Sequence, residues 1–227
     1  FRRRLLRWLF LPRQTFTIAL KPRLFLEIFD FIDLKRFHTV FIEDRFFLPL
    51  RTSQPLLVSV GSRNGFDIIK FDLDYPAGKL LVLEPSAENR SVIKENFAKN
   101  RVDASVLPYA LAAESGKAFL YREVSREGDR YLLDAIKAQS FTRVETRTMA
   151  WLLNHLLEPI DLILLNVPGK EEEVMLSIND HMAFFIKRLL LKENTLLINS
   201  RKIVRHMQSL GYFHEKRGRY HVFILAT

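Results

Sequence analysis

The 227-residue sequence contains no cysteine, which excludes a disulfide framework, a thiolate metal site and a cysteine nucleophile. It also lacks an apolar run long enough to form a membrane-spanning helix. Arginines and prolines interrupt every candidate apolar core near the N-terminus, so we expect no cleavable signal peptide. Because the chain starts at Phe1 and not at a methionine, we expect further residues upstream.

Acidic residues are missing from the first part of the chain, where none occurs before Glu27. Basic residues are frequent in the same stretch: Arg2, Arg3, Arg4, Arg7, Arg13, Lys21 and Arg23. The formal net charge of the whole chain is +9. This charge favours contact with an anionic membrane surface, nucleic acid, an acidic glycan or an acidic protein partner, and composition alone does not choose among them.

Leu5, Trp8 and Leu9 have the spacing of one face of a helix, and Pro12 is expected to end it. One interpretation is a short amphipathic helix that lies on a membrane or on a partner protein. The other is a helix that packs on its own domain and leaves its arginines in solvent. We expect a cytoplasmic protein, and the first interpretation would add peripheral association with a membrane.

Hydrophobic residues make up 48% of the chain, which is enough for a sizeable core. We therefore predict one domain over residues 51–227, preceded by a basic, aromatic-rich extension over residues 1–50. Within the domain, short apolar runs alternate with helical patterns, which is typical of a doubly wound, mainly parallel sheet. The predicted strands are residues 56–60, 79–85, 104–110, 160–166 and 194–200.

Two segments have strong helical periodicity. Residues 87–100 place Val92, Ile93 and Phe97 on one face, and residues 171–191 carry a longer stripe. That stripe consists of Val174, Met175, Ile178, Met182 and Phe185. After Gly211, residues 212–226 resemble a hairpin that turns at Arg217 and Gly218, so the last two strands are predicted to be antiparallel.

The first predicted strand leads into a turn that holds Gly61 and Gly65, and then into the start of a helix. In many α/β proteins a nucleotide pocket begins in this way, because glycines let the backbone approach the ligand. Ser59 stands two residues before Gly61, at a place where such folds usually carry an acid. Glu84 ends the second predicted strand and can accept hydrogen bonds from ribose hydroxyls, or else it caps the turn that follows.

Several blocks resemble, in order, those of the FkbM-type S-adenosylmethionine-dependent methyltransferases. They are VSVGSRNG, VLEPSAENRSVIKENFAKN, VLPYALAAESGKAFLY, VETRTMAWLLNHL and IDLILLNVPGKEEEVMLSI. The resemblance implies a Rossmann-like methyltransferase fold with a seven-stranded sheet. It also implies that S-adenosylmethionine is the cofactor, with Gly61 and Gly65 beside its methionine part and Glu84 on its ribose.

This sequence departs from the family pattern at three positions. Ser59 replaces the usual aspartate, and Asn166 and Pro168 stand in a block that usually reads D-V-E-G. Arg63 adds positive charge to the loop, either against a cationic cofactor or toward its carboxylate. Asn166 cannot act as a base, although it weakly resembles the amide that accepts from a target amine in N-P-P-aromatic methyltransferases. We regard Asn166 as a candidate catalytic residue, and Ser59 and Arg63 as further cofactor-site candidates.

Two hypotheses follow. The first is a methyltransferase that acts on a hydroxyl of a sugar, a glycan or another small acceptor. The second is a catalytically degenerate protein of the same fold that serves as a structural or interaction subunit, on an anionic surface or in a complex. The six histidines show no paired metal-ligand spacing, so no metal site is predicted.

Overall fold

A computed structural model describes residues 16–21, 24–28, 30–44, 49–125, 128–133, 140–193 and 199–226. The predicted helix around Leu5, Trp8 and Leu9 lies outside these residues. Residues 194–198, which belong to the segment predicted as the last parallel strand, lie outside them as well.

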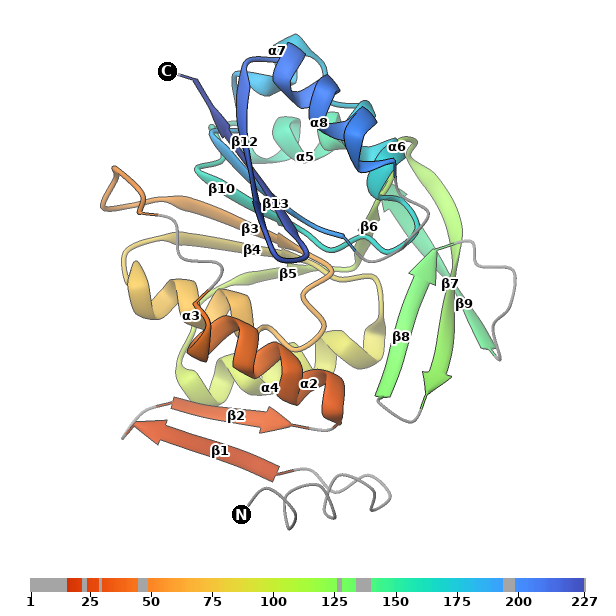
Figure 1. Ribbon diagram of the computed structural model, residues 1–227. Coiled ribbons are helices and arrows are strands. Elements are labelled where there is room, and N and C mark those ends of the chain that lie inside the picture. The colour runs from red at the N-terminus through yellow and green to blue at the C-terminus, as the bar shows by residue number, and fades with distance from the viewer. Residues whose placement is uncertain are drawn as a thin grey trace.

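The centre of the molecule is a seven-stranded sheet with the strand order β12-β13-β11-β10-β3-β4-β5 (Figure 1). Its strands are β3 (Leu56–Val60), β4 (Lys79–Leu83), β5 (Ser105–Leu107), β10 (Leu162–Leu165), β11 (Arg188–Lys192), β12 (Tyr212–Arg217) and β13 (Tyr220–Leu225). The five strands from β5 to β11 pair in parallel, and β13 pairs antiparallel with both β11 and β12. The predicted mainly parallel sheet with a C-terminal antiparallel hairpin is therefore confirmed.

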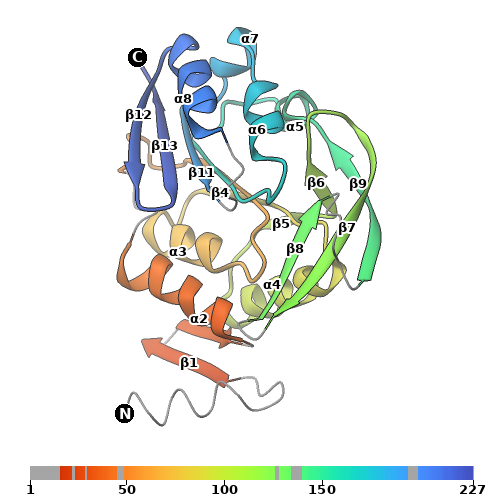
Figure 2. The same cartoon turned by 45° about the vertical axis from the view of Figure 1, so that its right-hand side comes forward.

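Helices cover both faces of this sheet (Figures 1 and 2). On one face lie α3 (Phe66–Asp74), α4 (Ala87–Asn100), α2 (Phe31–Phe37) and the π-helical turn η1 (His38–Ile42). On the other lie α5 (Met149–Leu156), α6 (Glu171–Leu176), α7 (Asp180–Ala183) and α8 (Ser200–Ser209). Each face has its own apolar core, and all five residues of β3 are buried because apolar side chains pack on both sides of it.

The chain leaves β3 toward the α3 face and leaves β10 toward the α6 face, although these two strands are neighbours. The crossovers thus diverge at the carboxyl ends of β3 and β10. In doubly wound sheets, a crevice of this kind is the usual position of a ligand.

The prediction of one strand over residues 104–110 is wrong. Pro108 separates β5 from β6 (Tyr109–Leu111), and β6 joins a second sheet with the order β6-β9-β7-β8. That sheet also contains β7 (Gly116–Ser125), β8 (Gly128–Leu133) and β9 (Ser140–Arg147). A proline has no N–H to donate to a ladder, so it marks the place where the chain changes sheets.

The prediction of one helix over residues 171–191 is also wrong, since this segment forms α6, α7 and β11. Asn179 starts α7 by accepting a hydrogen bond from the amide of Met182 at 3.0 Å. The predicted stripe breaks after Ile178, and Phe185 is 37% exposed. β11 is the fifth parallel strand, in the role that the sequence analysis gave to residues 194–200.

The N-terminal part described by the structure joins the core. The hairpin of β1 (Phe16–Lys21) and β2 (Leu24–Ile28) lies beside α2 and α4 (Figure 1). Leu26 and Val40 are buried in the same apolar cluster as Phe66 and Phe97. Asn96 of α4 accepts from the amide of Glu27 at 3.1 Å. No helix in the described ranges is long and apolar enough to cross a membrane.

Candidate functional site

The loop between β3 and α3 carries the two predicted glycines, both with positive φ (73° at Gly61 and 78° at Gly65). A Cβ on Gly61 would overlap the backbone oxygen of Asn166, and a Cβ on Gly65 would lie 2.7 Å from the ring of Phe97. Both positions therefore need glycine for backbone conformation and for close packing within the chain.

Glu84 follows β4 and lies against this loop. One carboxylate oxygen accepts from the amide of Arg63 at 3.0 Å, and the other accepts from the amide of Ser86 at 3.0 Å and from Asn89 Nδ2 at 3.1 Å. Glu84 is 3% exposed, and burial raises the pKa of its carboxyl while these hydrogen bonds limit the rise. The side chain thus ties the loop to the start of α4, as in the capping interpretation, at the position predicted for a ribose ligand.

Ser59 lies beside an acid that the sequence analysis missed. Its hydroxyl donates to Asp67 Oδ2, and the hydroxyl of Ser62 donates to Asp67 Oδ1 at 2.6 Å. Asp67 is in the first turn of α3 and is 1% exposed. The sequence did contain a signal for this acid: Asp67 is the one charged residue among the apolar residues from Phe66 to Ile69, and it follows Gly65 by two positions.

Arg36 of α2 completes this group, with Nη2 3.2 Å from Asp67 Oδ2. Its side chain is only 11% exposed. Sequence reasoning could not place Arg36 near the loop, because the two are separated by β3 and by residues 49–55 along the chain. Packing of α2 on the α3 face brings them together (Figure 1).

Arg63 points away from the loop toward the start of α2. Its Nε donates to Asp33 Oδ1 at 2.8 Å, and its Nη2 pairs with Asp30. Asn64 Nδ2 donates to the same oxygen of Asp33 at 3.0 Å. The positive charge that Arg63 adds to the loop is therefore matched by two carboxylates of the N-terminal part.

Asn166 lies where β10 ends, directly across from the loop. Its amide donates to Val60 O at 2.9 Å, and its Nδ2 donates to Gly61 O at 2.8 Å. Because Nδ2 faces a carbonyl, the other amide atom, Oδ1, is set as an acceptor on the opposite side. Val167 is buried directly after it, and Pro168 is half-buried.

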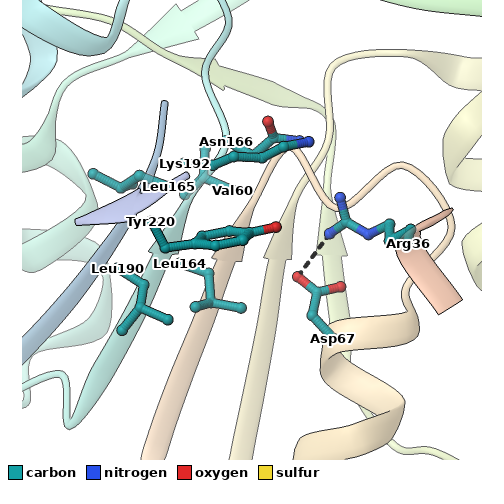
Figure 3. A pocket seen from close by; sticks show the side chains of 9 residues that line it. All are labelled: Arg36, Val60, Asp67, Leu164, Leu165, Asn166, Leu190, Lys192 and Tyr220. Atoms are coloured by element: carbon teal, nitrogen blue, oxygen red, sulfur yellow. Dashed lines mark ion pairs between the residues drawn. The ribbon is translucent and has the colours of Figure 1, made fainter. Parts of the chain in front are cut away.

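A small pocket, with room for about one water molecule, lies beside Asn166 at the carboxyl ends of the central strands (Figure 3). It is lined by Arg36, Val60, Asp67, Leu164, Leu165, Asn166, Leu190, Lys192 and Tyr220. Two of these residues hold buried polar atoms, Arg36 Nε and Asn166 Oδ1, for which the described part of the chain supplies no hydrogen-bond partner. Glu84 is not among the residues that line this pocket.

The structure thus brings together Ser59, Gly61 and Asn166, and separately Arg63 with Glu84. The first group meets Asp67 and Arg36 at the pocket. The second group lies over β4 and connects through Arg63 to α2. The two groups occupy adjacent parts of one edge of the sheet.

No protein-family model and no curated protein sequence matches the chain. Solved structures do resemble it. An O-methyltransferase family protein from Burkholderia thailandensis is 9% identical, over 86% of this chain and 57% of that one, with a TM-score of 0.50. A chain of the fibrillarin/Nop5p complex is 12% identical, over 93% of this chain and 91% of that one, with a TM-score of 0.50. At these identities the likeness is one of fold, and the fold is the Rossmann-like fold of S-adenosylmethionine-dependent methyltransferases.

Proposed function

We propose that the chain is an S-adenosylmethionine-dependent methyltransferase, of the FkbM type that its sequence resembles, which acts on a hydroxyl of a sugar or of another small acceptor. The observation that carries this proposal is the pocket at the diverging crossovers, where a buried donor and a buried acceptor have no hydrogen-bond partner among the described residues. Buried polar groups in folded proteins are nearly always paired, so unpaired ones beside a pocket point to a ligand.

The residues present fit the cofactor in outline. Glu84 would accept from ribose hydroxyls, and the loop from Gly61 to Gly65 would pass beside the ligand. The bound cofactor supplies a methyl group on a positively charged sulfur, and the chain's task is to align that methyl with the acceptor. Asp67 supplies a carboxylate on the pocket wall, in contact with Ser59, which stands where the family pattern has its acid.

A second candidate is a structural or interaction subunit that has kept the fold and lost the activity. The observation in its favour is that both oxygens of Glu84 already accept hydrogen bonds from the chain itself. In addition, close packing against Asn166 and Phe97 is enough to require glycine at positions 61 and 65, so these glycines need not indicate a ligand.

Calorimetric titration with S-adenosylmethionine and with S-adenosylhomocysteine separates the two candidates. The enzyme proposal expects saturable binding that weakens at least tenfold in Glu84→Gln, because a carboxamide is a poorer acceptor for two hydroxyls. Glu95→Gln, on the exposed side of α4, is the matched control and should bind as the unaltered protein does. Absence of binding at millimolar ligand would refute the enzyme proposal and leave the subunit.

A further inference from the structure

The second sheet, β6-β9-β7-β8, stands beside the central sheet and carries exposed aromatic rings on one face (Figure 2). We infer that this face is a docking surface for single-stranded nucleic acid. The inference goes beyond the proposed function and does not depend on it, because none of the residues that carry it belongs to the glycine loop or lines the pocket.

Alternation along the strands gives this sheet a buried face and an exposed face. On the buried face, Leu120 of β7 and Val144 of β9 belong to a small apolar cluster. On the exposed face, Phe119 is 44% and Phe141 is 65% exposed, and Tyr121 is half-buried. β7 and β9 are the two central strands, so the three rings stand in the middle of the open face. A sheet face in water ordinarily carries polar side chains at such positions.

The three rings form one cluster across the two strands, which we call the aromatic cluster. Tyr121 and Phe141 are directly opposite each other in the register, and Phe119 is opposite Arg143. The ring centroids are 5.2 Å apart for Phe119 and Phe141, and 6.0 Å apart for Tyr121 and Phe141. These contacts hold the side chains in place without covering them, so little conformational freedom is lost when a ligand stacks on them.

Basic side chains lie next to the aromatic cluster. Lys117 and Arg143 are exposed on the same face, and no described residue forms an ion pair with either of them. One acid, Glu145, also stands on this face, and Arg147 matches it at 2.8 Å. The positive charges of Lys117 and Arg143 are therefore available to complement a phosphate backbone.

A second group of rings continues the surface beyond Glu145. Tyr109 of β6 is opposite Glu145, and the guanidinium of Arg147 lies 4.3 Å from the centre of the Tyr109 ring. Trp151 of α5 packs edge-on against Tyr109, and the exposed ring of His155 stacks on Trp151. Residues 141–147 of β9 alone span about 20 Å, which is long enough for several nucleotides of one strand.

This combination fits a single strand better than other partners. Unpaired bases stack on aromatic side chains while cations follow the phosphates, and both features are present here. A duplex keeps its bases stacked inside and would use the charges alone. The core of a protein interface is depleted of lysine, whereas Lys117 lies two positions from Phe119 on the same face.

The first experiment measures fluorescence anisotropy of a labelled oligouridylate of about 12 nucleotides with the full chain. We expect Phe141→Ala to weaken binding about tenfold, or about 1.4 kcal/mol, and Phe141→Tyr to retain it, because tyrosine also stacks. The matched control is Phe184→Ala, which removes a ring that is 76% exposed at the end of α7 and should change binding less than about twofold. Since Phe141 is mostly exposed, its removal should leave the melting temperature unchanged.

The second experiment separates stacking from charge. We expect Arg143→Gln to lower the slope of log affinity against log salt by about one, and Phe141→Ala to leave that slope unchanged. A duplex of the same length and dextran sulfate, a polyanion without aromatic rings, should bind the unaltered protein and Phe141→Ala alike. Flotation with vesicles of phosphatidylserine and phosphatidylcholine should also be the same for both proteins.

Four results would overturn the inference: no binding of the oligouridylate at low salt, equal binding by the unaltered protein and Phe141→Ala, equal weakening of dextran sulfate, or a dependence on Phe141 that appears only with vesicles. The third would make the face a site for polyanions such as acidic glycans, and the fourth a membrane contact. None of these results touches the cofactor titration. Conversely, binding of the oligouridylate that depends on Phe141, without any binding of S-adenosylmethionine, would support this surface and refute the proposed function.

Discussion

Restoring the family's acid with Ser59→Asp should destabilise this protein. Ser59 is 1% exposed, and its hydroxyl donates to Asp67, which also accepts from Ser62. An aspartate at this position replaces a donor with a second carboxylate in a site that water does not reach. Two carboxylates in contact cannot both be ionised without a large penalty.

The magnitude can be worked from the contact. At an effective dielectric constant of about 20, two unit charges about 4 Å apart repel by roughly 4 kcal/mol. Arg36, at 3.2 Å from Asp67, offsets part of this, so we expect the free energy of unfolding to fall by about 3 kcal/mol. For a chain of this length, that corresponds to a melting temperature lower by roughly 6–12 °C.

The matched control is Ser59→Asn, which has the same size as the aspartate, carries no charge and can still donate to Asp67. The difference between the two variants therefore isolates the charge from overpacking. In folded Ser59→Asp, binding a proton to one of the two neighbouring carboxylates relieves the repulsion. The unfolded chain does not bind that proton near neutral pH. Its stability should thus fall as pH rises, and the gap between the variants should be larger at pH 8 than at pH 5.

Thermal unfolding of both variants at the two pH values, together with titration of S-adenosylhomocysteine, is the measurement. Equal melting temperatures at pH 8, combined with tighter ligand binding in Ser59→Asp, would refute this reasoning. That result would mean that a carboxylate at position 59 fits beside Asp67 and takes part in ligand binding.

Three further predictions concern other parts of the molecule. Gly61→Ala should cost about 2 kcal/mol or more, because its Cβ would overlap the backbone of Asn166 at a positive φ, and denaturant unfolding that matched the unaltered protein would contradict this. Burial lowers the pKa of His221 and of its hydrogen-bonded neighbour His214. Below about pH 6.5 these histidines are therefore protonated more in the unfolded chain than in the folded chain. Stability should therefore fall between pH 7.5 and 5.5, and His221→Gln should reduce that fall in urea titrations. Finally, if the arginines within residues 2–7 contact anionic lipid, each should add about 1 kcal/mol, and changing all of them to glutamine should abolish flotation with acidic liposomes but not alter the melting temperature.

The sequence by itself determined those helices and turns for which the apolar spacing, the capping residues and the turn residues all indicate the same structure. Residues 87–100 form α4 as predicted, because apolar spacing and the capping side chain of Ser86 indicate the same helix. Gly218 allows the tight turn of the closing hairpin. Glu84 could be placed beside the glycine loop, since the carboxyl ends of neighbouring parallel strands meet at one edge.

The tertiary structure decided what local signals leave open. Leu189, Leu190 and Leu191 form a short apolar run, and a buried strand and a buried helical segment share that pattern. Only its place between β10 and β13 makes this run a strand. The pocket depends on Arg36 and Asp67, which lie 31 positions apart and meet because α2 packs on the α3 face. A contact of this kind has no periodicity along the chain, since it depends on how separate elements pack in space.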